Sequence, residues 1–177
     1  MSDQKHNNSE NEVKVRYKDI KEKWMGVSRK DGGNVLYAKS VTSGGKRYYI
    51  KGNKVQLKPS NHEINVAQLI CELTGKTIMV LPKVNIPEGI LTPDYLINGK
   101  QYELKTVYKN GKNTIYNKFE KRQSNNFILY VDDNSGQTEE SLKEQIKKVF
   151  CSERRRHVNR IVVIMNKKII AVYKKSK

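Results

Sequence analysis

Two acidic residues and one lysine in a predicted β-hairpin are the residues of this sequence best suited to chemistry. They are Asp94, Glu103 and Lys105, and the pair Asn98-Gly99 lies between the two acids. Asn-Gly is the strongest short-range signal for a two-residue hairpin loop. With such a loop, Asp94 lies directly opposite Glu103 and on the same face of the sheet. A three-residue loop would instead move Asp94 to the other face, so the prediction depends on the turn type.

Two carboxylates at opposed positions need a positive charge between them. Opposed side chains in a sheet lie about 5 Å apart, and like charges at that distance are destabilising. Either Lys105, on the same face as Glu103, or a divalent cation would offset the repulsion. Hard carboxylate oxygens suit Mg²⁺ first, with Mn²⁺ and Zn²⁺ as the other ions. The hairpin therefore predicts a divalent-metal site, and its simpler alternative is a solvated strand face with an ion pair.

Well-delimited elements surround this hairpin from Ser60 onward. Ser60 and Glu63 form a capping-box signature, which predicts a helix that ends at Gly75. Thr138 is expected to begin a later helix. The other expected elements are strands at 77–81, 94–97, 101–108 and 127–131, a basic helix at 113–124, and a closing hairpin at 161–165 and 168–173.

The order of these elements predicts an α/β fold with a mixed central sheet and helices on both faces. From residue 60 the order is helix, three strands, helix and strand, followed by a helix and two strands. Residues 60–177 are expected to form this domain. Residues 1–59 are expected to be a small basic N-terminal extension, with a short helix near 16–24 and two or three small strands.

The charge of the chain favours a polyanionic partner. Its 35 Lys and Arg residues against 18 Asp and Glu residues give a formal net charge of +17 over 177 residues. Nucleic acid fits best, because Lys and Arg release counterions when they neutralise phosphates. We find no run of about 20 apolar residues and no basic amphipathic helix, so we expect a soluble, cytoplasmic chain without a membrane partner. Cys71 and Cys151 are expected to be reduced thiols.

The motif residues resemble the PD-(D/E)XK nuclease superfamily. Pro93-Asp94 precedes Glu103-Leu104-Lys105, behind a helix that carries Glu63 and before a helix that carries Gln123. In more detail, the stretches Leu81-Pro82, LTPDYLINGK, ELK and RQSNN look like the C-terminal toxin nuclease domain of CdiA contact-dependent growth inhibition proteins, many of which cleave tRNA. The resemblance covers about residues 61–174 and implies a PD-(D/E)XK-like core.

The resemblance also implies a role for each residue of the hairpin. Asp94 and Glu103 would ligate the metal, and the backbone carbonyl of Leu104 would be a further ligand. Lys105 would orient or help to deprotonate the attacking water and stabilise the transition state. Whether one or two metal ions bind stays open.

Glu63 and Gln123 resemble two accessory residues of the superfamily. Glu63 corresponds to the additional acidic ligand, and Gln123 to the polar residue that the next helix places beside the site. Each also has a simpler interpretation, because a capping-box Glu needs no catalytic role and a polar helix end commonly carries a surface Gln. His62 is either an accessory acid or an ordinary helix-start histidine.

Basic residues flank the predicted site and are expected to contact phosphates. Most charge runs are merely solvated, but runs on both sides of an acidic site would hold a substrate that the carboxylates repel. The expected phosphate contacts are Lys118, Lys121, Arg122, Arg154, Arg155 and Arg156.

These features predict a metal-dependent endonuclease, first of all a tRNA-cleaving antibacterial toxin that acts in the cytoplasm of a target cell. Its expected partners are nucleic acid, tRNA rather than DNA, and an acidic immunity protein, because an uninhibited nuclease would poison its producer. One alternative is a DNA-cleaving nuclease of a mobile element or repair system. The other is a nucleic-acid-binding module without catalysis, in which Glu103 and Lys105 form only a salt bridge.

Overall fold

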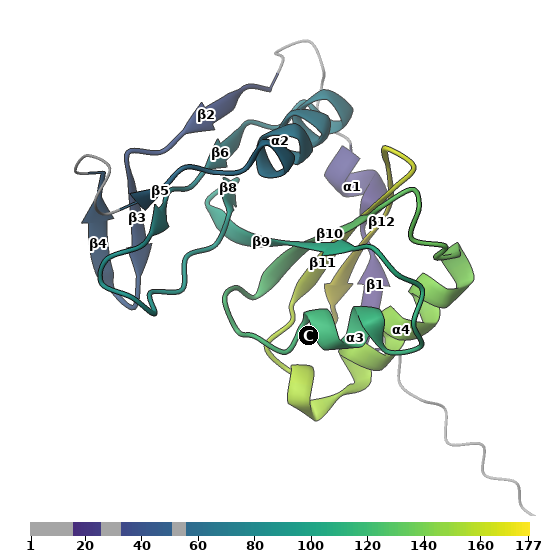
Figure 1. Cartoon of the computed structure of the whole chain (residues 1–177). Coiled ribbons are helices and arrows are strands. Elements are labelled where there is room, and N and C mark those ends of the chain that lie inside the picture. The colour runs from purple at the N-terminus through teal and green to yellow at the C-terminus, as the bar shows by residue number, and fades with distance from the viewer. Residues whose placement is uncertain (1–15, 26–32, 51–55) are drawn as a thin grey trace, which may run out of the picture.

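An eight-stranded mixed sheet forms the centre of the molecule in the computed structural model, which describes residues 16–25, 33–50 and 56–177 (Figure 1). In spatial order its strands are β1 (Tyr17–Asp19), β12 (Lys168–Lys175), β11 (Arg160–Met165), β10 (Asn126–Val131), β9 (Lys100–Val107), β8 (Tyr95–Ile97), β6 (Ile78–Val80) and β2 (Val35–Tyr37). The pairs β9–β10, β10–β11 and β2–β6 are parallel, and the other pairs are antiparallel. The predicted mixed sheet is confirmed.

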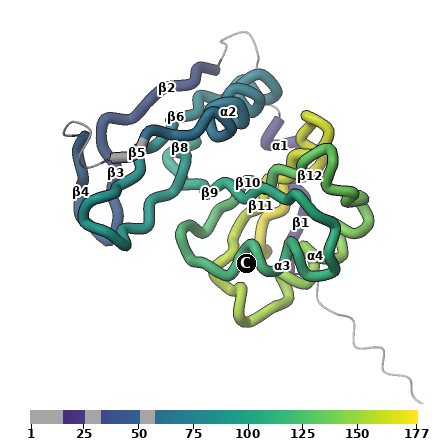
Figure 2. The backbone as a smooth tube through the Cα atoms, viewed as in Figure 1, coloured from purple at the N-terminus to yellow at the C-terminus, as the bar shows by residue number. Residues whose placement is uncertain are grey.

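Helices cover both faces of this sheet, as predicted (Figures 1 and 2). The helices α1 (Lys21–Met25) and α2 (Asn61–Thr74) pack on one face, and α3 (Thr114–Lys118) and α4 (Glu139–Cys151) pack on the other. Alternate residues of one strand supply the two cores, because successive side chains point to opposite faces. In β10, for example, Ile128 packs in the core with α2, whereas Phe127 and Leu129 pack in the core with α4.

The two long helices begin and end where the sequence predicts. The capping box is formed at the start of α2, where the Ser60 side chain accepts from the backbone N–H of Glu63, and Gly75 ends that helix at φ 69°. The Thr138 side chain caps α4 by accepting from the backbone N–H of Ser141. Among the described residues, none of the helices has the length and apolar character needed to cross a membrane.

The β8–β9 hairpin, which carries Asp94 and Glu103, has the predicted register. Tyr95 pairs with Tyr102 and Ile97 with Lys100, so the loop consists of Asn98 and Gly99 alone. Both loop residues have positive φ, 48° and 71°. Such values are typical of the primed turns that match the twist of a hairpin. Asp94 therefore comes to lie opposite Glu103, one position beyond the last paired residue of β8.

The expected N-terminal extension takes part in the sheet at both edges. β1 pairs with β12 at one edge, and β2 pairs with β6 at the other. The prediction of a helix over 16–24 is wrong in its first half, because residues 17–19 pair with the exposed edge of β12 and α1 begins only at Lys21. A small hairpin, β3 (Ser40–Ser43) with β4 (Lys46–Tyr49), and the pair β5 (Gln56–Leu57) with β7 (Lys83–Val84) lie outside the large sheet.

The predicted helix at 113–124 is also shorter than expected. α3 ends at Lys118, because its only buried apolar residues are Ile115 and the adjoining Phe119. Two of the polar residues that follow form hydrogen bonds with the backbone at the start of β9. The Ser124 hydroxyl and the Asn126 side-chain amide both donate to the backbone carbonyl of Gln101, at 2.9 and 3.1 Å.

Candidate active site

Asp94 and Glu103 are both buried at the end of the β8–β9 hairpin, with 4% and 7% of their surface exposed. The backbone N–H of Leu104 donates to Asp94 Oδ2 at 2.7 Å. In a strand, the N–H and C=O of one residue point to the same side. The Leu104 carbonyl therefore also faces the side of the strand on which Asp94 lies.

Burial and mutual repulsion disturb the ionisation of both carboxylates. Burial is the main cause that raises the pKa of Asp94. Burial, together with the charge of Asp94, raises the pKa of Glu103 to about 7. Glu103 Oε2 is buried, and no atom of the described residues forms a hydrogen bond with it. A buried carboxylate oxygen without a partner is costly, so this atom calls for a proton or a cation.

A lysine that the sequence did not reveal, Lys83 in β7, lies between two of the acids. Its Nζ contacts Asp94 Oδ1 at 3.2 Å and forms a closer ion pair with Glu63 Oε1. Burial lowers the pKa of Lys83, but its pairing with Glu63 and Asp94 outweighs that effect and raises the pKa overall. No spacing or motif links Lys83 to the two acids, because Glu63 lies 20 residues before it and Asp94 belongs to the hairpin that follows it.

Glu63 completes the capping box as well as this ion pair. Its Oε2 accepts from the backbone N–H of Ser60 at 3.2 Å, which confirms the capping interpretation. The Tyr95 hydroxyl donates to the Glu63 backbone carbonyl at 2.7 Å and so ties the start of α2 to the hairpin. A role of Glu63 as a metal ligand stays a prediction, because Lys83 occupies its Oε1.

Lys105 and Gln123 form the other side of the site. Lys105 Nζ donates to Glu103 Oε1 at 3.2 Å and to Gln123 Oε1 at 3.1 Å. Gln123 thus lies beside the predicted site, although it lies five residues beyond the end of α3. The two hydrogen bonds hold the ammonium group of Lys105 next to the carboxylate whose second oxygen has no partner.

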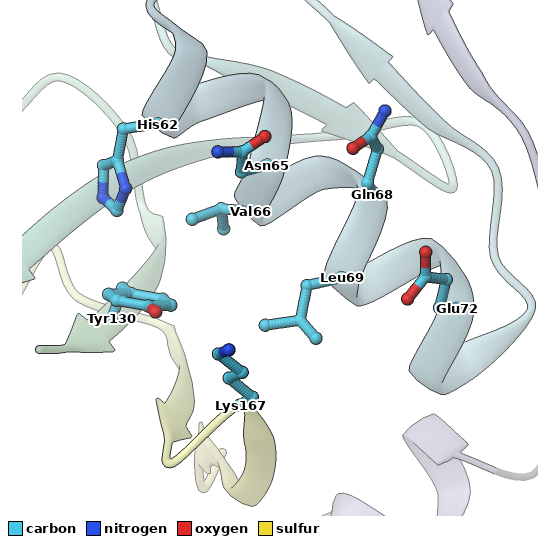
Figure 3. Close-up of a pocket in the computed structure, with 8 residues that line it drawn as sticks. All are labelled: His62, Asn65, Val66, Gln68, Leu69, Glu72, Tyr130 and Lys167. Carbon is cyan, nitrogen blue, oxygen red and sulfur yellow. The ribbon is translucent and has the colours of Figure 1, made fainter. Parts of the chain in front are cut away.

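His62 is turned toward a separate hollow of about 390 Å³, lined by α2, Tyr130 and Lys167 (Figure 3). Its Nε2 lies 2.8 Å from the hydroxyl of Thr106, and its ring meets the edge of Tyr130 at 5.1 Å. These contacts are those of a packed helix-start histidine rather than of an accessory acid beside the carboxylates.

The predicted phosphate contacts differ in their accessibility. Lys121, Arg122, Arg154 and Arg156 are exposed, and Lys118 is half-buried. Arg155 is an exception, because it is only 8% exposed. Its Nε donates to the Tyr116 backbone carbonyl at 3.3 Å, and its guanidinium lies 4.5 Å from the centre of the Tyr116 ring. The expectation that Arg155 contacts phosphate is therefore not met, since its guanidinium holds α3 and the segment after α4 together.

The carboxylates fit a metal ion only as a pair. Within the described ranges, no group of three or more His, Cys, Asp or Glu side chains is arranged to hold a metal. Asp94 and Glu103 with the Leu104 carbonyl offer a set of hard oxygen donors, and the unpartnered Oε2 of Glu103 is available to it. Among the described residues, the three acids Glu63, Asp94 and Glu103 form ion pairs with Lys83 and Lys105 alone. With all three acids ionised, the cluster keeps one uncompensated negative charge, which favours the binding of a divalent cation.

Comparisons with known proteins find a family model that matches part of the chain, including this hairpin. Residues 91–170 match the sequence model of the family described as contact-dependent growth inhibition CdiA C-terminal domain. The curated proteins contain no significant match to the chain. Among solved structures, a chain of the CdiA-CT/CdiI toxin and immunity complex from Burkholderia pseudomallei is similar, with 17% identity and a TM-score of 0.44 over 71% of this chain and 98% of that one. The family match includes Asp94, Glu103, Lys105 and Gln123, whereas Glu63 and Lys83 precede it.

Proposed function

We propose that this chain is a toxin domain of contact-dependent growth inhibition that hydrolyses phosphodiester bonds in RNA, with tRNA as the first candidate and a divalent metal ion as cofactor. The observation that carries the proposal is the pair of buried, opposed carboxylates beside Lys105. This constellation lies within the segment that matches the CdiA C-terminal domain family.

The residues present suit Mg²⁺, or Mn²⁺ or Zn²⁺ in its place. Asp94, Glu103 and the Leu104 carbonyl would hold the ion, and the uncompensated charge of the cluster favours its binding. When bound, such an ion polarises the scissile phosphate and lowers the pKa of a coordinated water. The raised pKa values of both carboxylates support this assignment, since each acid is destabilised as an anion until a cation is near.

Lys105 provides the fixed positive charge of the proposed reaction. A water oxygen forms a bond to phosphorus and the water releases one proton, while the bond from phosphorus to the leaving ribose oxygen breaks and that oxygen takes up one proton, so that the step balances. The ammonium group of Lys105, held by Glu103 and Gln123, stabilises the negative charge that develops on the phosphate oxygens and orients the water. Lys83 maintains Glu63 and Asp94 in place from the other side.

The fold and the biology of the proposal follow from the same features. The order α2, β6, β8, β9, α3, β10 around the carboxylates resembles the PD-(D/E)XK core, and we assign the chain to that superfamily as part of the proposal. A toxin of this kind is delivered into a target cell, where tRNA is accessible. Its producer needs an acidic immunity protein that covers the site, because the nuclease would otherwise attack the producer's own RNA.

The test is an assay of the purified chain on total tRNA and on plasmid DNA, with Mg²⁺, Mn²⁺ or Zn²⁺ and with a chelator. We expect metal-dependent cleavage of tRNA that falls by about 10²-fold or more in Asp94→Asn and in Lys105→Ala. Glu144→Gln is the matched control, because Glu144 is exposed on α4 and pairs only with Lys148.

Three outcomes would contradict the proposal in different ways. Intact tRNA and DNA under every metal would show a binding module without catalysis. Cleavage of plasmid DNA with intact tRNA would favour the DNA nuclease. Equal cleavage by the wild-type chain and the folded Asp94→Asn variant, or cleavage that persists in chelator, would remove the proposed active site.

A further inference from the structure

Three hollows adjoin one another across the β8–β9 turn. The first, about 540 Å³, lies against the β3–β4 hairpin and shares Leu96 and Gln101 with the second, of about 520 Å³. The second shares Lys100, Asn125 and Asn126 with the third, of about 370 Å³. The three hollows therefore adjoin one another from the β3–β4 hairpin to the C-terminal end of β12, and we name the surface that they line the cationic groove.

Among the residues that the structure describes, none of those that line the cationic groove is acidic, although the chain has 18 Asp and Glu residues. None of its cations forms an ion pair within the part of the chain that the structure describes. Unpaired cations along a row of adjoining hollows are suited to a chain of phosphates, because each one can replace a condensed counterion. Six of these cations are Lys39, Arg47, Lys100, Arg122, Arg160 and Lys174.

Amide side chains line the groove between the cations. Gln101, Asn125 and Asn126 line the second hollow, and Asn159 lines the third. Backbone hydrogen bonds at the start of β10 and β11 hold Asn125 and Asn159 side by side. The Asn125 carbonyl accepts from the backbone N–H groups of Asn159 and Arg160 at 2.8 and 3.3 Å. The Asn126 side chain already donates to the Gln101 carbonyl at 3.1 Å, and the Gln101 side chain donates to the Thr42 carbonyl at 3.4 Å. Since an amide NH₂ carries two donors, each of the four side chains keeps an N–H and a carbonyl oxygen for the edge of a nucleobase.

The amides favour an unpaired RNA segment over a duplex. In an A-form helix the base edges are paired, and the deep, narrow major groove is closed to side chains, so side chains read single-stranded loops instead. At the far end of the groove, Tyr37 lines the first hollow with 57% of its surface exposed, and its ring is available for base stacking.

The cationic groove reaches the candidate active site through one side chain. Gln123 lines the second hollow, and its Oε1 accepts from Lys105 Nζ at 3.1 Å. A strand that lies in the groove therefore passes next to the lysine that would act on the scissile phosphate. The first and third hollows, which adjoin the one that Gln123 lines, would hold the nucleotides on either side of the cleaved bond.

We infer that an unpaired RNA segment binds along the cationic groove, with phosphates on its lysines and arginines, base edges on its amides and one base stacked on Tyr37. This inference rests on the proposed function and specifies its substrate as a single-stranded loop. An acidic protein that covers the same cations is the competing occupant, and the amide lining and the exposed ring favour RNA.

The experiment measures binding without cleavage. The full chain carrying Glu103→Gln is titrated in chelator against a fluorescein-labelled single-stranded RNA of mixed sequence, the same RNA annealed to its complement, and poly-glutamate. The double variants Lys39→Ala/Arg47→Ala and Lys100→Ala/Lys174→Ala remove two groove charges each. The matched control, Lys143→Ala/Lys147→Ala, removes two charges from exposed positions of α4.

Each groove variant is expected to weaken single-strand binding by about tenfold and to lower the salt slope by about 1.4, which is 0.7 per phosphate contact. Tyr37→Ala is expected to weaken binding by about tenfold and to leave the salt slope unchanged. The control is expected to change binding less than about twofold, because neither lysine lines any of the three hollows and salt weakens the effect of charges that do not contact the strand.

Unchanged binding in both groove variants would overturn the inference, and so would an equal loss in the α4 control or duplex binding as tight as single-strand binding. Poly-glutamate that binds as tightly as RNA with the same dependence on the groove residues would assign the groove to an acidic protein instead. Failure of the wild-type chain to cleave tRNA would overturn the proposed function alone, because the binding measurement uses an inactive variant.

Discussion

At the scale of single residues, the candidate site consists of buried carboxylates whose negative charges are partly compensated by two lysines. Lys83 pairs with Glu63 and Asp94, and Lys105 pairs with Glu103 and Gln123. Neither lysine satisfies Glu103 Oε2. Glu103 is therefore the acid that lacks a positive partner most. The pH dependence of the free energy of unfolding, which its ionisation controls, can be measured without any substrate.

The metal-free protein is expected to lose stability as the pH rises from about 5 to 8. The pKa of Glu103 is about 7 in the folded chain, above the ordinary value of 4.5, so the folded state binds more protons than the unfolded state between these values. The stability that this group contributes is thus fully present below about 4.5 and is lost as the pH rises through 7. The loss should amount to about 1–3 kcal/mol.

Urea unfolding in chelator at pH 5 and pH 8 measures this loss for the wild-type chain and for Glu103→Gln. The variant cannot ionise, so its free energy of unfolding relative to wild type should rise by about 1–3 kcal/mol between the two pH values. Glu144→Gln, at an exposed position of α4, should show no such change. If Glu103→Gln keeps the full pH dependence of the wild type, another group causes that dependence and the pKa of Glu103 is not raised by its surroundings.

At the scale of elements, the two-residue turn between β8 and β9 decides which side chains share a face. A slip of one residue would move Asp94 to the face covered by α2 and leave Glu103 without its opposed acid. The turn fixes the register because both of its residues adopt positive φ. The parallel neighbour β10 then holds β9 in place, with Glu103 level with Phe127 and Lys105 level with Leu129.

Gly99→Ala is expected to destabilise the protein by about 1 kcal/mol. The φ of Gly99 is 71°, which is unfavourable for a residue with a Cβ, and no atom lies within 4 Å of a Cβ built there. The cost is therefore conformational rather than steric. Asn98→Gly is the control at the adjacent position of positive φ, and it should leave the stability unchanged or slightly raise it. Thermal unfolding of both variants makes the comparison, and equal effects would argue against this turn geometry.

At the scale of the whole molecule, the N-terminal segment is part of the structure that supports the site. β1 and β2 occupy the two edges of the large sheet, and Trp24 packs in the same core as α2. The boundary predicted at residue 59 thus does not coincide with a boundary between sheets. Because α2 begins at the capping box of Glu63, the packing of α1 against α2 stabilises the element that carries one of the three acids.

Trp24→Ala is expected to destabilise the protein by about 3–5 kcal/mol, because the side chain is only 7% exposed and its removal leaves a cavity between α1 and α2. Tyr37→Ala, at an exposed aromatic residue of the same N-terminal segment, should change the stability by less than about 0.5 kcal/mol. Urea unfolding compares the two. A small effect of Trp24→Ala would show that the N-terminal segment contributes little to the core.

Local signals in the sequence determined much of this protein. The caps at Ser60, Gly75 and Thr138 and the turn at Asn98-Gly99 were predicted because each depends on residues within a few positions of one another. The same holds for the order of the helices and of the large-sheet strands from residue 60, since it follows from apolar periodicity, whereas the short strand β7 was not predicted. These local rules were sufficient to place Asp94 opposite Glu103 and to put Lys105 on their face.

The tertiary structure alone decided the rest, because it depends on contacts between residues far apart in the chain. Tyr17–Asp19 forms a strand only because the edge of β12 is there to accept it, and Arg155 turns inward only because Tyr116 lies beneath it. Lys83 meets Glu63 and Asp94 through the packing of β7 beside the hairpin. Spacing and periodicity describe one segment at a time, whereas the compensation of a buried charge and the joining of hollows into one groove depend on how separate segments pack.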